Sequence, residues 1–594
     1  MLGLLCPMVL FNGLTTPLAA YEVSLQAGTD ADLTGLLEGG SLVIEQASEE
    51  EPLTPQEIIA TAQADYKRLL AVLYDQGYYG PTIRISVDGR EAATLDPVRP
   101  PGAVNRIVVT VDPGKKFQFG RAEVRPLAPD TTLPEGFQTK EVARLSLMRQ
   151  AANAGITGWR NQGHAKAELK DQKITANHGE GQINAEIVLN PGPKLTFGPL
   201  NVTGNEAVRT ERILEIPGLP EGQVFSPKEL EDAAERLRRT GTFSSVAMIE
   251  SQTVNAGNTL PITAQISENK PRRFGFGAEL ATIEGLTLSG FWLHRNFFGG
   301  AESLRFDAEI AGIGGDTGGI DYLLGTRYER PATFNEDTTL FALAEVEQLD
   351  QVNFFSRRVS IGAGIQRFAS DQRTYTFGLG FRRATTRDVF GDSDYTLFIL
   401  QGGLEFDYRD VELDARKGYY INAEFSPFLA LSGSDNGLLT EVDYRKYFTF
   451  GEQQRTTLAF RGQLGSVIGP SLADAPADFL FYSGGGGTVR GHDYQSLGVD
   501  VGLDELAGGR SFVGLSAELR FRTEGSLGYV GFFDAGYIGE EELPDGSGEW
   551  HSGAGIGIRY DTGIGPIRVD LAVPVTGDNS DSNFQIYIGI GQSF

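Results

Sequence analysis

The chain has 594 residues, which is too many for one compact core, so we expect at least two domains. Glycine is abundant at 76 residues, and no run of eighteen apolar residues follows the N-terminal segment, so any membrane span must consist of strands. The net charge of -27 argues against a nucleic-acid-binding surface, and a single cysteine, Cys6, argues against disulfides and cysteine-based metal sites.

Residues 1–20 form an apolar segment that ends in the small residues Ala19 and Ala20, a pattern typical of a signal peptide. No lysine or arginine precedes the segment, which favours a true start further upstream. Leu5 is too large for the position before the cysteine of a lipoprotein signal, so we do not expect a lipid anchor at Cys6.

A repeated pattern follows this segment. Residues 112–124 begin with Asp-Pro-Gly and recur at 190–202, which begin with Asn-Pro-Gly, and Phe119 and Phe197 occupy the same place in the two copies. Such self-similarity is the signature of tandem modules. A glycine after a predicted helix recurs at Gly77, Gly163 and Gly241, so we expect three units over residues 21–115, 116–193 and 194–270.

Each unit is expected to be a small α+β module with the order β-α-α-β-β. In the third unit, Ser226 and Glu229 form a capping box around Pro227, and in the first unit Thr54 and Glu57 repeat the device. A sheet of this kind leaves an edge strand whose backbone can pair with another chain. The modules therefore either hold unfolded polypeptide or act as spacers.

The remainder, residues 271–594, shows strands of about ten residues separated by Gly, Asp and Asn, which is typical of a transmembrane barrel. Around Arg568 and Asp570, every second residue is apolar, so one face of the strand meets lipid and the other meets water. About sixteen strands are expected, from 273–282 to 582–593, an even number as in bacterial single-chain barrels. The last strand carries Phe584, Ile586, Ile588 and Ile590 on one face, and the sequence ends on Phe594.

The one long interruption between these strands holds four consecutive glycines from Gly484, followed by Val489, Arg490, Gly491 and His492. Glycines let a backbone pass through a confined space, and an arginine then offers five fixed donors there. A buried arginine needs carboxylate partners, and the strand-like stretches downstream supply Glu518 and Asp534 as candidates. The alternative is a flexible loop with an ordinary surface arginine.

The Val-Arg-Gly-His motif, Glu518, Asp534 and the final Phe594 together resemble the Omp85 family of outer-membrane assembly proteins. This resemblance implies that a long extracellular loop places Arg490 inside the barrel against the two acidic residues. It also implies POTRA modules in the periplasm, a barrel in the outer-membrane lipid bilayer, and a C-terminal assembly signal that ends on an aromatic residue. The sequence departs from the family at His492, where Phe or Tyr is usual, and we expect the histidine to serve as a flat ring.

The resemblance further implies that the protein inserts unfolded outer-membrane protein clients, including autotransporters. Three modules favour the subfamily that works with a TamB-like, inner-membrane-anchored periplasmic partner, and we expect a monomeric barrel. Five modules are usual for the central assembly subunit, and two modules plus a plug helix for two-partner-secretion transporters. A passive solute channel is a more distant alternative, since porins lack tandem periplasmic modules.

The first and last strands are expected to meet at a seam that opens sideways for client strands. The first strand carries Phe274, Gly275, Phe276 and Gly277, and the last carries Gly589 and Gly591. Glycine weakens strand packing and loosens register, so both edges are expected to be soft. The alternative is that these glycines only ease barrel curvature.

No motif of a hydrolase, metalloprotease or nucleotide-binding enzyme occurs in the sequence, and the five histidines lack ligand spacing. We therefore expect no enzymatic activity, no cofactor and no bound metal.

Overall fold

The computed structural model describes residues 21–28, 30–47, 53–281, 285–315, 318–451, 453–502, 505–563, 565–577 and 584–594. The expected signal peptide and positions 582 and 583 of the expected last strand lie outside these ranges. Among the described residues, no helix combines the length and the apolar character needed to cross a membrane. The chain divides into two compact units, residues 1–199 with 220–229 and 252–261, and residues 200–219 with 230–251 and 262–594.

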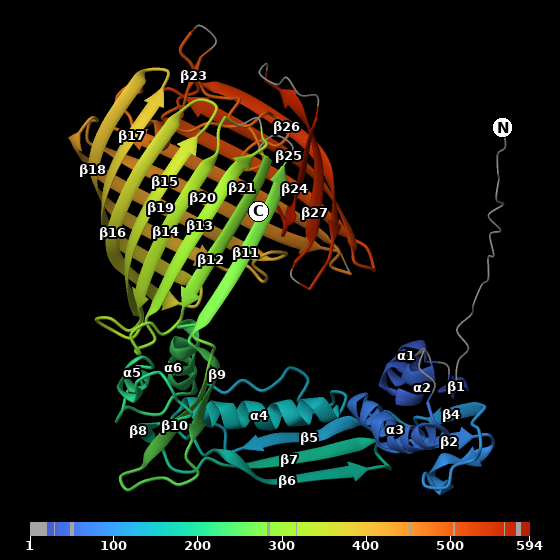
Figure 1. The fold of residues 1–594 in the computed structure, drawn as a ribbon. Coiled ribbons are helices and arrows are strands. Elements are labelled where there is room, and N and C mark those ends of the chain that lie inside the picture. The colour runs from blue at the N-terminus through green and yellow to red at the C-terminus, as the bar shows by residue number, and fades with distance from the viewer. Residues whose placement is uncertain are drawn as a thin grey trace, which may run out of the picture. The chain divides into compact units, whose positions relative to one another are not determined.

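The first sheet has four strands in the order β1-β4-β2-β3, and three helices accompany it (Figure 1). Its long helix, α3, begins at a complete capping box in which Thr54 and Glu57 each bond the other's backbone N–H. Gly77 follows the helix with a φ of +87°, a left-handed conformation that favours glycine. The elements are β1 Glu22–Gln26, α1 Ala31–Gly40, α2 Leu42–Ala47, α3 Pro55–Asp75, β2 Thr82–Val87, β3 Arg90–Glu91 and β4 Arg106–Asp112.

The second sheet has the order β5-β7-β6, with β5 parallel and β6 antiparallel to β7. Helix α4 lies along this sheet (Figure 1) and buries Met148, Ala151 and Gly155. All residues of 116–193 are described, and this unit contains one α-helix. Residues 126–144 form turns and irregular chain in place of the other expected helix. The elements are β5 Gln118–Arg125, α4 Leu145–Asn161, β6 Glu168–Asn177 and β7 Gln182–Asn190.

The third sheet has the order β8-β10-β9 and follows the expected β-α-α-β-β order of elements. Gly163 and Gly241, the other two helix-ending glycines, have φ values of +95° and +67°, so all three adopt the left-handed conformation. The elements are β8 Thr196–Thr203, α5 Thr210–Glu215, α6 Pro227–Arg239, β9 Phe243–Glu250 and β10 Thr259–Glu268.

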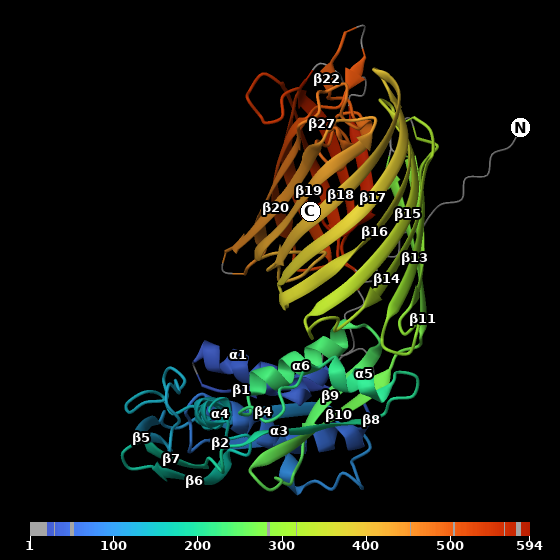
Figure 2. The same ribbon diagram turned by 90° about the vertical axis from the view of Figure 1, so that its left-hand side faces the viewer.

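Sixteen strands form a closed barrel in which each strand pairs with the next barrel strand and β28 returns to β11. Figure 2 shows the tilted strands of the barrel wall. The alternation expected around Arg568 is confirmed, since Ile567, Val569 and Leu571 are exposed on the outside while Asp570 is buried. The strands are β11 Arg272–Ala281, β12 Gly285–His294, β13 Ser303–Ile313, β14 Asp321–Arg330, β15 Thr338–Asp350, β16 Phe355–Ser370, β17 Arg373–Asp388, β18 Gly391–Asp407, β19 Gly418–Ser432, β20 Gly437–Phe450, β21 Thr456–Ile468, β24 Ser511–Arg522, β25 Leu527–Gly539, β26 Glu549–Tyr560, β27 Ile567–Thr576 and β28 Gln585–Ile590.

Helix α6 is tied to the turn between β14 and β15 by charged side chains, all within the second unit. Arg236 binds Asp337 through two parallel bonds, Nε to Oδ1 at 2.9 Å and Nη2 to Oδ2 at 3.0 Å, and Arg239 Nη2 adds a bond of 3.3 Å. Burial on its own would raise the pKa of the Asp337 carboxyl, but the hydrogen bonds from the two arginines hold this pKa below its ordinary value. The carboxylate is therefore the form that the contact requires.

The lowered pKa of Asp337 predicts how this contact responds to pH. Because the folded pKa lies below the unfolded one, the contact is at full strength above about pH 4 and is lost as the pH falls through the folded value. We expect α6 of the Asp337→Asn variant to be held at pH 7 as loosely as α6 of the wild type is held only in acid. Hydrogen exchange of α6, corrected for the intrinsic effect of pH, measures it, and equal exchange in the two proteins at pH 7 would contradict the expectation.

Candidate functional site

The segment 469–510, which we call the lumen loop, leaves β21 and turns into the barrel before β24. It includes the short strands β22 Val499–Asp500 and β23 Leu506–Ala507 and one turn of 3-10 helix, Ala477–Phe479. Gly491 has a φ of +100°, and a Cβ there would lie 2.6 Å from the backbone of Val573. Gly553 on β26 faces the loop, and a Cβ there would lie 2.0 Å from the Arg490 carbonyl oxygen. Glycine on both sides therefore lets the loop backbone touch the wall.

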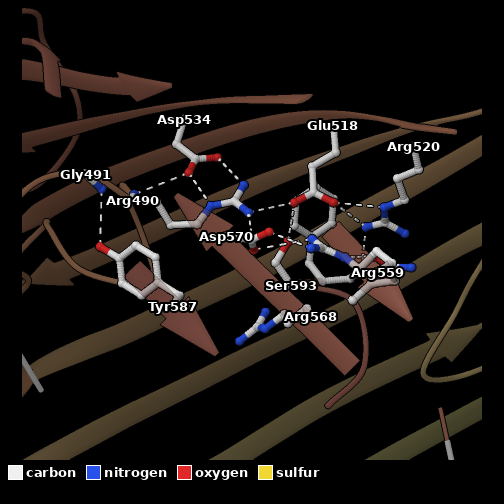
Figure 3. A network of polar contacts seen from close by, with 12 residues as sticks. Arg490, Gly491, Glu518, Arg520, Asp534, Arg559, Arg568, Asp570, Tyr587 and Ser593 are labelled. Atoms are coloured by element: carbon white, nitrogen blue, oxygen red, sulfur yellow. Dashed lines mark hydrogen bonds and ion pairs between the residues drawn. The ribbon is translucent and has the colours of Figure 1, made fainter. Parts of the chain in front are cut away.

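Arg490 is a buried residue of the lumen loop, and its side chain is 4% exposed. Its Nε and Nη2 atoms bind the two Asp534 oxygens at 2.7 and 3.0 Å, a bidentate pair, and Nη1 lies 2.8 Å from Glu518 Oε1 (Figure 3). The guanidinium also stacks 3.6 Å from the centroid of the Phe532 ring. The structure thus brings together the arginine and the two carboxylates that the sequence nominated.

A third carboxylate, Asp570 on β27, completes the site 3.5 Å from Arg490 Nη1. Arg520 binds Glu518 at 2.8 Å, and Arg559 binds Asp570 at 2.5 Å, so three arginines balance three carboxylates in the buried network (Figure 3). A buried charge set of this kind is tolerated only when it is neutral and fully bonded. The sequence placed Asp570 on the water-facing side of its strand but gave no signal that β27 would lie beside the loop.

His492 occupies the place of the usual aromatic residue as a flat buried ring. Its Nε2 atom lies 2.9 Å from the Ser552 carbonyl oxygen, and its ring centroid lies 4.3 Å from that of His551. His551 Nε2 in turn lies 2.7 Å from Ser483 Oγ on the lumen loop. Val489, on the other side of Arg490, is fully buried. Every position of the Val-Arg-Gly-His motif therefore contacts the barrel wall.

The lumen loop has a second charged anchor, of opposite sign, at Asp478. Its carboxylate has no exposed surface, lies 2.8 Å from Arg358 Nη1 on β16 and 3.7 Å from Arg382 Nη1 on β17, and accepts a short hydrogen bond from the Tyr395 hydroxyl on β18. The neighbouring Phe479 packs edge-on against Phe428, with centroids 5.3 Å apart. This anchor was not predicted from the sequence, because an isolated acidic residue in a loop carries no distinguishing pattern.

The closing pair of strands, β11 and β28, makes the weakest pairing of the described barrel. Among the residues that the structure describes, Leu280 with Ile588 and Ala281 with Tyr587 are paired across it, two pairs against ten between β11 and β12 and six between β27 and β28. The seam was expected at Phe274, Gly275, Phe276 and Gly277. In the described chain these four residues pair with β12 alone, and the pairs with β28 lie further along β11. Gly589 faces Arg568, and Gly591, with a φ of +91°, lies beyond the end of β28.

The chain after β28 turns into the lumen, where the sequence analysis expected the strand to continue to residue 593. The Ser593 hydroxyl makes a short hydrogen bond to Glu518, and the Phe594 ring is buried against Ala415 and Tyr447. The expected lipid-facing row is present, because Ile586, Ile588 and Ile590 face outward and are exposed. Phe584 beside them is exposed as well. Among the described residues, no cluster of three or more His, Cys, Asp or Glu side chains is arranged to hold a metal ion.

Family comparison places this barrel and its loop among known proteins. Residues 296–594 match the Omp85 superfamily domain, which is half of the chain, and residues 195–269 match the POTRA model, the surface antigen variable number repeat. The chain belongs to the Omp85 superfamily. As an Omp85 protein, it has an outer-membrane barrel of sixteen strands and periplasmic POTRA domains.

The relatives that this Omp85 chain resembles include assembly factors. It is 23% identical over 461 residues to the outer membrane protein assembly factor BamA of Nitratidesulfovibrio vulgaris, covering 72% of this chain and 55% of that protein. BamA of Neisseria meningitidis is 22% identical over 561 residues, covering 82% of this chain and 68% of that protein. The chain thus spans only about half the length of the first relative. A crystal structure of BamA from Haemophilus ducreyi lacking POTRA domains 1–3 has the same fold, with a TM-score of 0.62, 18% identity, and coverage of 80% of this chain and all of that one.

Proposed function

We propose that this protein inserts unfolded outer-membrane proteins into the membrane by pairing their strands at the seam between β11 and β28. The observation that carries the proposal is the short pairing at this seam, since residues 272–279 of β11 make no pair with β28 in the described chain. Unpaired backbone groups in lipid cost several kcal/mol each, so a weakly paired seam is the place where an incoming strand gains most by supplying its own hydrogen bonds. This activity is non-enzymatic and uses no cofactor or metal.

The periplasmic modules supply a second surface for clients in this proposal. Strand β6 lies at the edge of its sheet, pairs with β7 alone among the described residues, and is exposed along its whole length. An exposed edge of ten residues offers unpaired N–H and C=O groups to an extended chain without selecting its sequence. It would therefore hold an unfolded client before its strands reach the seam.

Within the superfamily, we propose the TamA subfamily with a TamB-like partner anchored in the inner membrane. The support is the presence of three sheets before the barrel among the described residues. The BamA names of the relatives favour the alternative, a central assembly subunit. Copurification of a large periplasm-spanning protein supports the first, and copurification of assembly lipoproteins supports the second.

Locking the seam tests the proposed function directly. Leu280 and Ile588 are paired partners, so a Leu280→Cys, Ile588→Cys protein oxidised to a disulfide is expected to stop client assembly and to recover it on reduction. The matched control is Ala278→Cys with Leu288→Cys, which joins β11 to β12 and leaves the seam free. Normal client assembly by the oxidised seam variant would refute insertion at this seam.

A further inference from the structure

The outer face of the strands β11 to β14 carries positive charge without negative charge. Arg272 on β11 shares its face with Phe274 and Phe276, which are 63% and 89% exposed, and Arg330 on β14 shares its face with the exposed Leu324. Every Asp and Glu in the described parts of these four strands falls on the alternate side, toward the lumen: Glu279, Asp307, Glu309, Asp321 and Glu329. This face therefore attracts anions, although the whole chain has a net charge of -27.

The two arginines lie at the same end of the barrel wall. Strand β11 begins at Arg272 and β14 ends at Arg330, and the four strands between them run antiparallel. The register sets Arg272 beside His294, His294 beside Leu304, and Leu304 beside Tyr328, two residues before Arg330. Both arginines are thus the last outward side chains at the end of the apolar surface.

This end of the wall faces the periplasm, because the turn after β12 touches the third module. The Thr242 hydroxyl donates to the Arg295 carbonyl oxygen at 2.8 Å, and the Arg209 backbone N–H donates to the Gly299 carbonyl oxygen at 2.8 Å. The two arginines therefore lie at the boundary between the lipid-facing wall and the polar module, which is the level of lipid headgroups.

A chain of aromatic rings spans the outer surface between the two arginines. Neighbouring ring centroids lie 6.0, 5.7, 4.7 and 6.0 Å apart in the order Trp292, His294, Phe297, Phe298 and Tyr328. Phe298 at the middle of the turn is 65% exposed. Aromatic rings in this position pack against the boundary between headgroups and acyl chains, so they hold a lipid where an arginine can reach its phosphate.

The outward arginines are free to bind a ligand. Neither Arg272 nor Arg330 makes a side-chain hydrogen bond or an ion pair with any residue that the structure describes, and both are exposed. On the lumen face of the same wall, by contrast, Arg305 and Arg327 bind carboxylates two residues along their own strands, at 2.7 and 2.6 Å. A guanidinium matches the oxygens of a phosphate with two parallel donors.

We propose that Arg272 and Arg330 bind the phosphate groups of anionic phospholipids in the membrane leaflet that faces the periplasm. The aromatic chain packs against the same lipids. Binding holds the strands β11 to β14, and the third module that touches their turns, at the membrane surface. The proposal goes beyond client insertion and does not depend on opening of the seam.

Binding of phosphatidylglycerol to the full-length protein in detergent micelles, counted by native mass spectrometry, tests the proposal. Each basic residue at a membrane surface contributes about a fivefold factor in affinity for anionic lipid. Arg272→Ala and Arg330→Ala are each expected to weaken binding by about this factor, and the double variant is expected to weaken it further. Binding of phosphatidylcholine, whose choline cancels the phosphate charge, should stay at the wild-type level.

The matched control is the double variant Arg305→Ala, Arg327→Ala, which removes two positive charges from the lumen face of the same wall. It should bind phosphatidylglycerol like the wild type. An equal loss in this control would overturn the proposal, because net charge alone would then govern binding, and so would wild-type binding by the Arg272, Arg330 double variant. Displacement of the lipid by inorganic phosphate at the same concentration would assign the arginines to a free anion and refute the lipid. No client is present, so the result is independent of the seam assay.

Discussion

Arg490→Ala is expected to release the lumen loop from the β24, β25 and β27 wall. The substitution leaves Asp534 without its bidentate partner and leaves three carboxylates with two arginines in a buried site. Removing one member of a buried ion-pair set costs about 3–5 kcal/mol, because the remaining charges stay buried without compensation. We expect a lower unfolding temperature of the barrel in heat-modified gel mobility and reduced client assembly.

Arg490→Lys serves as the matched control for this prediction. Lysine keeps the charge but has no planar fork, so it cannot bind both Asp534 oxygens and Glu518 at once. Its loss of stability should therefore lie between those of the wild type and Arg490→Ala. Wild-type heat modification together with full client assembly in the alanine variant would show that the arginine does not hold the loop.

Asp478→Asn is expected to free the opposite end of the lumen loop. The amide keeps the shape of the side chain but removes the charge that faces Arg358 and Arg382, so Arg358 keeps only Glu345 and Glu347 as ion-pair partners and Arg382 loses Asp478. Because Arg358 keeps Glu347, the expected cost is that of lost charge-assisted hydrogen bonds, about 1.5–3 kcal/mol. Because Arg490 still binds the β24, β25 and β27 wall, we expect the barrel to remain folded while its lumen becomes more permeable. Ion conductance in planar bilayers measures this permeability.

The same substitution at Asp474 provides the control for Asp478→Asn. Asp474 lies in the same loop but is exposed, and among the described residues its carboxylate bonds only the Ser471 hydroxyl, so Asp474→Asn should leave conductance at the wild-type level. Equal conductance of the Asp478 variant and the wild type would mean that the second anchor does not close the lumen.

The features that the sequence predicted are those set by neighbouring residues. Lipid-facing and water-facing positions alternate along β27 because successive side chains of a strand point to opposite faces. The start of α3 follows from Thr54 and Glu57, three residues apart, and its end from Gly77. The motif around Arg490 is followed by two strand-like stretches that each supply an acidic residue. This pattern was enough to predict Glu518 and Asp534 as the partners of Arg490.

Contacts between distant segments were decided only by the tertiary structure. Asp570 joins the Arg490 site and Asp478 meets Arg358 because the barrel closes on itself and encloses the lumen loop, and no local pattern encodes which wall a loop residue will face. The same holds for the seam. A strand pattern gives the faces of β28, but its shortness and the inward turn to Ser593 and Phe594 arise because buried hydrogen bonds in the lumen, at Glu518 and Arg520, compete with continued pairing in the wall.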